Sequence, residues 1–102
     1  MERPSKDPDI LEKARRLIAE GNYRDTWHSN ERKTLRVISR FEIIHVIQSG
    51  YWEKKKDKFD DEWSAWNYAI RGKTLDKREL RVIVSIDEKT GLLIITVIDL
   101  TK

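Results

Sequence analysis

The sequence predicts an α+β domain, with short helices in its first half and an antiparallel β-sheet in its second half. Apolar residues recur at helical spacing between Pro8 and Gly21. Near the C-terminus, two apolar runs at residues 80–86 and 92–98 flank a short loop that ends in a glycine. We therefore expect two to three N-terminal helices packed on a sheet of four to five antiparallel strands.

The first helix begins after Pro8, which suits a first helical turn, and it ends before Gly21. A short strand within residues 22–27 would follow and lead into His28. The next polar residues, at 29 and 30, are suitable helix caps and predict a second helix that extends to about residue 37.

Ser39 and Glu42 form an S-x-x-E capping box, which predicts a third helix to about Gln48. In a capping box the hydroxyl and the carboxylate each accept a hydrogen bond from a free backbone N–H at the start of the helix. Gly50 is expected to end this helix in a left-handed conformation.

The remaining residues have the period of strands. Residues 51–56 predict an edge strand, residues 63–71 an aromatic-rich strand, and residues 72–78 a mobile loop. The runs on either side of the loop at residues 87–91 predict a hairpin, with Gly91 in a left-handed conformation. The last run is apolar on both faces, so we expect it in the interior of the sheet.

Composition limits the class of protein. The 102 residues suit one domain, and the absence of cysteine favours a reducing compartment, so we expect a cytoplasmic protein. No apolar stretch is long enough for a signal peptide or a membrane span. The 21 basic and 18 acidic residues give a net charge of +3, which favours nucleic acid only weakly. The basic run at residues 54–56 is followed by acidic residues and is expected to be solvated.

His28, Arg32 and Arg36 follow one another at intervals of four, so a helix would present all three on one side. Cleavage of a phosphodiester without a metal ion needs a group that transfers a proton and fixed positive charge for the developing phosphorane. Histidine and arginine supply these. The alternative is the solvated face of an amphipathic helix, in which Glu31 or Asp25 pairs with the basic side chains.

The sheet offers polar partners for such a site. In a strand, Asn67 and Arg71 would share one face, as would Arg81 and Ser85 in theirs. These four side chains are candidates for lining a groove. The sequence predicts no metal site or other cofactor, because two histidines seventeen residues apart without cysteine do not form a recognisable zinc motif and no glycine-rich phosphate loop occurs.

Residues 28–50, HSNERKTLRVISRFEIIHVIQSG, resemble the pattern H-A-x-x-R-x-x-x-R-x-I-S-x-x-(D/E) followed by a helix and a glycine. This pattern is found in a small uncharacterised prokaryotic domain family that is similar to RelE-like toxins. Residues 66–73 resemble the central strand of that family, and residues 81–84 and 95–97 resemble its closing hairpin. Ser29 departs from the usual alanine. We therefore expect one domain over residues 1–102, with a helix in residues 1–21 and a family-like core in residues 22–100.

The resemblance implies a RelE-like or barnase-like fold and a toxin-like, metal-independent endoribonuclease. It implies that His28 acts as base or acid, that Arg32 and Arg36 hold the phosphate, and that three basic residues bind substrate, to which the strand alternation adds Asn67 as a candidate. These basic residues are Arg71, Lys73 and Arg81.

One alternative is a non-catalytic module that binds RNA or a partner protein through the same basic face. Another is an interaction subunit that neutralises, or is neutralised by, a cognate antitoxin-like protein, with the helix in residues 1–21 as a docking element that the core does not need in order to fold. The sequence does not indicate an oligomeric state.

Overall fold

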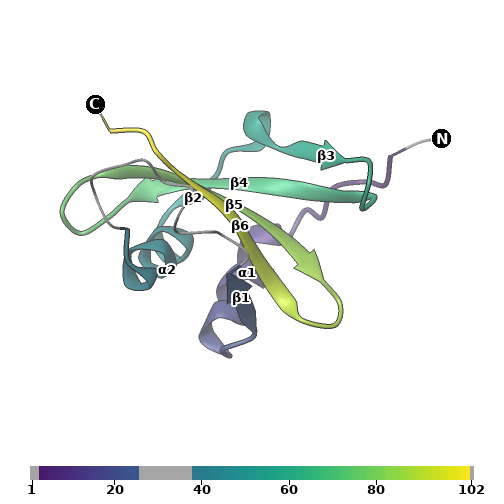
Figure 1. Cartoon of the computed structure of the whole chain (residues 1–102), viewed down its shortest axis with the longest axis horizontal. Coiled ribbons are helices and arrows are strands. Elements are labelled where there is room, and N and C mark those ends of the chain that lie inside the picture. Colours follow the sequence, from purple (N-terminus) through teal and green to yellow (C-terminus); the bar gives the residue numbers. More distant parts are fainter. Residues whose placement is uncertain (1–2, 26–37, 102) are drawn as a thin grey trace.

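The computed structural model describes residues 3–25 and 38–101. In this part of the chain the fold is α+β, with two α-helices and a single six-stranded sheet. Both helices lie on the same side of the sheet, and β3 lies toward the other side (Figure 1). None of the helices in the described ranges has the length and apolarity needed to cross a membrane.

The sheet has the order β1-β6-β5-β4-β2, and β3 pairs with β4 beside β2. The expected sheet of four to five antiparallel strands is therefore corrected to six strands in a mixed sheet, because β1 runs parallel to β6. The elements are α1 (Ile10–Ala19), β1 (Tyr23–Asp25), α2 (Arg40–Ser49), β2 (Tyr51–Trp52), the 3₁₀ turn η2 (Lys54–Lys56), β3 (Lys58–Asp60), β4 (Ala65–Lys73), β5 (Glu79–Asp87) and β6 (Gly91–Asp99).

The helix predicted before Gly21 and the strand predicted within residues 22–27 are present as α1 and β1. The helix predicted at residues 29–37 lies outside the described residues. The predicted edge strand at residues 51–56 is wrong in its length, since β2 contains only two residues and η2 follows it. After η2, Asp57 contacts the edge of β4 again. Its carboxylate accepts a hydrogen bond from the Ala69 backbone N–H at 2.9 Å.

The capping box at the start of α2 is confirmed. The Glu42 backbone N–H donates to the Ser39 hydroxyl, and the Ser39 backbone N–H donates to the Glu42 carboxylate. At the other end of α2, the Arg15 guanidinium from α1 donates to the carbonyls of Ile47 and Gly50. Arg15 thus satisfies free carbonyls at the helix C-terminus, where a positive charge is also favourable.

The left-handed conformation expected at Gly50 is wrong, since its φ is −85°. Gly50 is required for a different reason, which is close approach. A Cβ atom there would lie 2.3 Å from the Arg71 carbonyl oxygen and 2.6 Å from that of Val46. The absence of a side chain therefore lets the end of α2 pack directly against β4.

The core lies between the two helices and the sheet. Alternate residues of β4 and β5 point into it, among them Tyr68, Ile70, Val82 and Val84. The helices supply a second apolar layer, formed by Ile10, Ala14, Ile18, Ile43, Val46 and Ile47. At the N-terminus, the chain continues across the sheet edge, where the Trp66 indole N–H donates to the Pro4 carbonyl at 2.7 Å.

The C-terminal hairpin is also confirmed. Gly91 has a φ of +89°, as expected for the left-handed residue of this loop. The β6 strand lies between β1 and β5, which agrees with the interior position predicted for it. No helix of the described residues covers the other face of this sheet (Figure 1).

Candidate nucleic-acid interface

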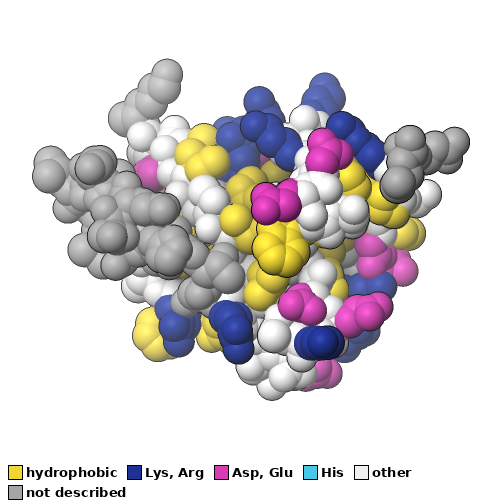
Figure 2. Space-filling view, turned by 45° about the vertical axis from the view of Figure 1, so that its right-hand side comes forward, with side chains coloured by type: hydrophobic (Ala, Val, Ile, Leu, Met, Phe, Trp, Pro, Cys, Tyr) yellow, Lys and Arg dark blue, Asp and Glu magenta, His cyan; other side chains and the backbone are white. Residues whose placement is uncertain are grey.

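A groove of about 360 Å³ lies on the face of the sheet opposite to the helices. It combines basic and polar side chains with an apolar floor. Figure 2 shows Lys and Arg side chains gathered along the upper edge of the molecule, on the side where Figure 1 places β3, with apolar side chains below them. The residues that line the groove are Lys56, Lys58, Asn67, Arg81, Ile83, Ile95, Thr96 and Ile98.

Strand register explains why these side chains come together. Lys58 on β3 is the partner of Asn67 on β4, so both point to the same face. On the next strand pair, Arg81 is the partner of Ile98 and Ile83 is the partner of Thr96. The register between β5 and β6 shifts next to Ile83, where β6 has an extra residue. Such a β-bulge bends a strand and re-aims its side chains.

A cluster of two arginines and two glutamates lies beside this groove. Arg71 and Arg81 are register partners on β4 and β5. Glu53 accepts from the Arg81 Nε at 2.7 Å and from the Arg71 Nη1 at 3.0 Å, and Glu79 accepts from the Arg71 Nε at 2.5 Å. The charges in the cluster balance.

The arginines also change the acidity of their partners. Hydrogen bonding from Arg81, followed by that from Arg71, lowers the pKa of Glu53 below its ordinary value, although burial opposes this. Glu79, and then Glu53, raise the pKa of Arg71. Glu53 is therefore a carboxylate anion at neutral pH, and it holds both guanidiniums in place.

The structure brings together some of the residues predicted to form a site. Asn67 and Arg81 line the groove, and Arg71 lies next to Arg81 but is paired with acidic side chains. Lys73 is exposed at the end of β4, outside the groove. Ser85, a fourth candidate for lining it, is buried and donates to the Trp66 carbonyl. His28, Arg32 and Arg36 lie outside the described residues.

A second hollow, of about 480 Å³, is lined by Gly21, Tyr23, Arg24 and Arg40. Arg24 and Arg40 lie on opposite sides of residues 26–37 in the sequence. The hollow thus lies between β1 and the start of α2.

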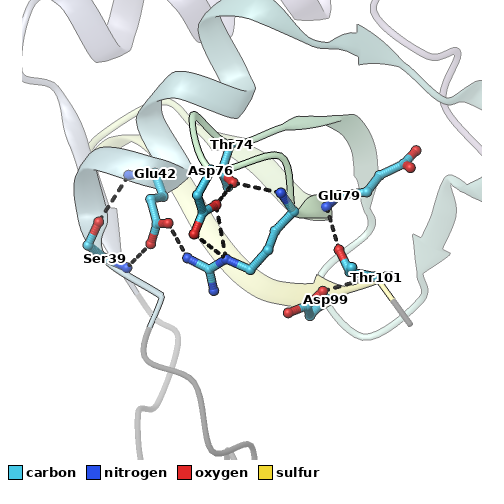
Figure 3. A network of polar contacts seen from close by, with 8 residues as sticks. Ser39, Glu42, Thr74, Asp76, Glu79, Asp99 and Thr101 are labelled. Atoms are coloured by element: carbon cyan, nitrogen blue, oxygen red, sulfur yellow. Dashed lines mark hydrogen bonds and ion pairs between the residues drawn. The ribbon is translucent and has the colours of Figure 1, made fainter.

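The loop between β4 and β5, predicted to be mobile, is shorter than expected and is held by hydrogen bonds. Thr74 and Arg78 are buried. The Thr74 backbone N–H donates to the Arg78 carbonyl, and the Arg78 backbone N–H donates to the Thr74 hydroxyl, so two hydrogen bonds close the loop. The Arg78 guanidinium donates to the carboxylates of Glu42 and Asp76. Figure 3 shows dashed contacts that run from both of these labelled carboxylates to one guanidinium. The loop is thereby fastened to the start of α2.

Glu42 serves both the helix cap and this loop. Burial raises the pKa of Glu42, but hydrogen bonds from the Ser39 backbone and from Arg78 outweigh burial, so the pKa lies below its ordinary value. Asp76, which bonds to the Thr74 hydroxyl and to Arg78, also has a lowered pKa. This network has a structural role, because it joins α2 to the β4–β5 loop.

Three charged residues of the interface, Glu53, Lys56 and Lys58, were not predicted from the sequence. Lys56 was expected to belong to a solvated basic run, and Lys58, two positions further along the chain, was not singled out. For Glu53, no signal in the sequence was available, because its partners depend on how β2 pairs with β4.

The chain belongs to a family that is described as a domain of unknown function, DUF4258, whose model matches residues 26–99. This agrees with the expected resemblance to an uncharacterised domain family. No curated protein and no solved structure matches the chain.

Proposed function

We propose that this protein acts on RNA, as a toxin-like endoribonuclease that does not require a metal ion. The observation that carries the proposal is the groove on the outer face of the sheet. Lysine and arginine side chains around it suit phosphates, while Asn67 and the apolar floor suit unstacked bases. Such a surface fits single-stranded RNA better than a small apolar ligand.

The reaction assigned to His28, Arg32 and Arg36 is attack by a ribose 2′-OH on the adjacent phosphodiester. The 2′-oxygen forms a bond to phosphorus, the bond to the 5′-oxygen breaks, and the products are a 2′,3′-cyclic phosphate and a 5′-hydroxyl. His28 accepts the proton of the 2′-OH or donates a proton to the leaving oxygen, and the arginines bind the charged phosphorane. This assignment rests on the H-x-x-x-R-x-x-x-R spacing of the sequence.

The RelE-like or barnase-like fold is part of the same proposal. It is supported by two helices packed on one face of a sheet in which every strand pair except β1 with β6 is antiparallel, among the described residues. The parallel β1 is a departure from an all-antiparallel arrangement.

The test is incubation of the purified protein with ribosomal and synthetic RNA in EDTA, with products separated on a gel. We expect cleavage by the wild type and a loss of about 100-fold or more in His28→Ala and Arg32→Ala, since a general acid–base group and a group that stabilises developing charge each contribute factors of this size. His45→Ala, on α2, is the matched histidine control and should retain activity. His28→Ala with unchanged thermal stability and full activity would rule out the proposed mechanism.

The second candidate is a non-catalytic module that binds RNA or an antitoxin-like protein. It is favoured by the pairing of Arg71 and Arg81 with Glu53 and Glu79, which makes that part of the interface a structured ion network rather than a reactive centre. For RNA, this module would show binding that weakens with salt, without any product. For a protein partner, it would form a stoichiometric complex that survives ribonuclease treatment.

A further inference from the structure

The juxtaposition of Arg71 and Arg81 requires an anion. Residues directly opposite each other in an antiparallel pair have side chains in close contact, so two guanidiniums at such a position repel each other. A sheet that needed only stability would avoid this pairing. Local features that break such a rule are common at functional sites.

Glu53 supplies the anion that both arginines share in this structure, while Glu79 pairs with Arg71 alone of the two. The two carboxylate oxygens of Glu53 receive three contacts, from the Arg81 Nε at 2.7 Å, the Arg71 Nη1 at 3.0 Å and the Arg81 Nη2 at 3.3 Å. An oxyanion gripped by two guanidiniums in this way has the arrangement by which arginines bind a phosphate group. Glu53 thus occupies a position suited to a phosphate.

The position is continuous with the groove and is reachable from solvent. Arg81 both lines the groove and holds Glu53. The side chains of Arg71 and Glu53 are 29% and 15% exposed. The backbone of Glu53 is fixed by its N–H, which donates to the Ala69 carbonyl at 2.8 Å, so its departure requires only rotation of the side chain.

We propose that Arg71 and Arg81 form a binding site for a phosphodiester, and that Glu53 is an internal anion which an RNA phosphate displaces. This inference rests on the proposed function and names the phosphate site of the same interface. A phosphodiester has one negative charge, as the glutamate does, so the exchange leaves the charge around the arginines unchanged. Glu53 therefore keeps the site ordered when it is empty and competes with RNA.

The test measures binding of the full chain to a fluorescent 2′-O-methyl oligouridylate in EDTA. This probe cannot be cleaved through a 2′-OH, so the result is independent of whether the protein is a nuclease. Glu53→Gln removes the competing charge and keeps the shape of the side chain. We expect it to bind the probe about tenfold more tightly than the wild type, a difference of about 1.4 kcal/mol.

Glu79→Gln is the matched control. It changes the net charge by the same amount, but Glu79 contacts Arg71 alone of the two arginines, whereas Glu53 contacts both. Its affinity for the probe should stay within about twofold of the wild type. Adding Arg81→Gln to Glu53→Gln should remove the gain, because the groove-lining guanidinium is then lost.

Four results would overturn the proposal or one of its parts. Unchanged or weaker binding by Glu53→Gln, with thermal stability retained, would show that Glu53 does not compete with RNA. An equal gain in affinity for Glu53→Gln and Glu79→Gln would show that the change in net charge alone explains the tighter binding. Titration with inorganic phosphate forms a second arm, and a gain for phosphate without a gain for the oligonucleotide would overturn the assignment to RNA. If Glu53→Gln does not fold, the wild type and Arg81→Lys are compared, and equal affinity for the probe would contradict the site.

Discussion

At the scale of single residues, Asp57 shows how a carboxylate can complete a sheet. Its side chain is fully buried and accepts from the Trp52 indole N–H at 2.9 Å and from the Ala69 backbone N–H at 2.9 Å. The Lys6 ammonium lies 3.0 Å from the same carboxylate. Because η2 takes the chain away from the edge of β4, the Asp57 carboxylate replaces a backbone carbonyl that a regular strand would provide.

Replacing Asp57 with alanine should therefore destabilise the protein strongly. The change leaves the Trp52 and Ala69 N–H groups without their partner, and each such buried donor costs about 1–3 kcal/mol. We expect a loss of about 3 kcal/mol in the free energy of unfolding, measured by urea denaturation. The control is Asp61→Ala, on the exposed turn that follows β3, which should change stability by less than about 0.5 kcal/mol. Similar urea midpoints for both variants would contradict this role of Asp57.

Some of the interface could be predicted from residues alone. Strand alternation was sufficient to place Asn67 and Arg71 on one face, because side chains in a strand point alternately to its two sides. Alternation could not predict that Glu53 would neutralise the arginines. That contact depends on Tyr51 pairing with Arg71, a tertiary register set by the packing of the sheet.

At the scale of elements, the junction of α2 with β4 depends on two glycines that face each other. A Cβ on Gly72 would lie 3.0 Å from the Gly50 Cα atom. The sequence correctly indicated both the capping box and a glycine at the other end of α2, since these are local signals. It could not reveal that this glycine is needed for contact with Arg71 and Gly72, which lie 21 and 22 positions further along the chain.

Gly50→Ala should separate α2 from β4. The new Cβ atom would lie 2.3 Å from a backbone oxygen of Arg71, and no side-chain rotation can relieve this overlap. We expect the free energy of unfolding to fall by about 3 kcal/mol, at the upper end of the usual cost of overpacking. The comparison is Gly21→Ala, which meets no atom within 4 Å but has a φ of +78° and should cost about 1 kcal/mol. Equal losses in urea denaturation would show that backbone conformation, rather than close approach, explains Gly50.

At the scale of the whole molecule, the family match and the hydrophobic core cover different parts of the chain. The match begins at residue 26, whereas α1 lies before it and contributes three buried residues, Ile10, Ala14 and Ile18. Through Arg15, α1 also binds the C-terminal carbonyls of α2. The sequence suggested that α1 was a separable docking element, because amphipathic spacing does not distinguish a helix that packs on its own sheet from one that packs on a partner.

Deletion of residues 1–21 should unfold the chain rather than release a folded core. The deletion removes two buried isoleucines, and truncating one such side chain costs about 2–5 kcal/mol. The sum is comparable with the whole stability of a small domain, about 5–15 kcal/mol. We expect the shortened chain to show no cooperative thermal transition by circular dichroism. The control is Glu12→Ala, on the exposed side of α1, which should melt close to the wild-type temperature. A cooperative transition near that temperature in the shortened chain would instead show that residues 22–102 fold alone, and α1 would then be free to serve as a docking element.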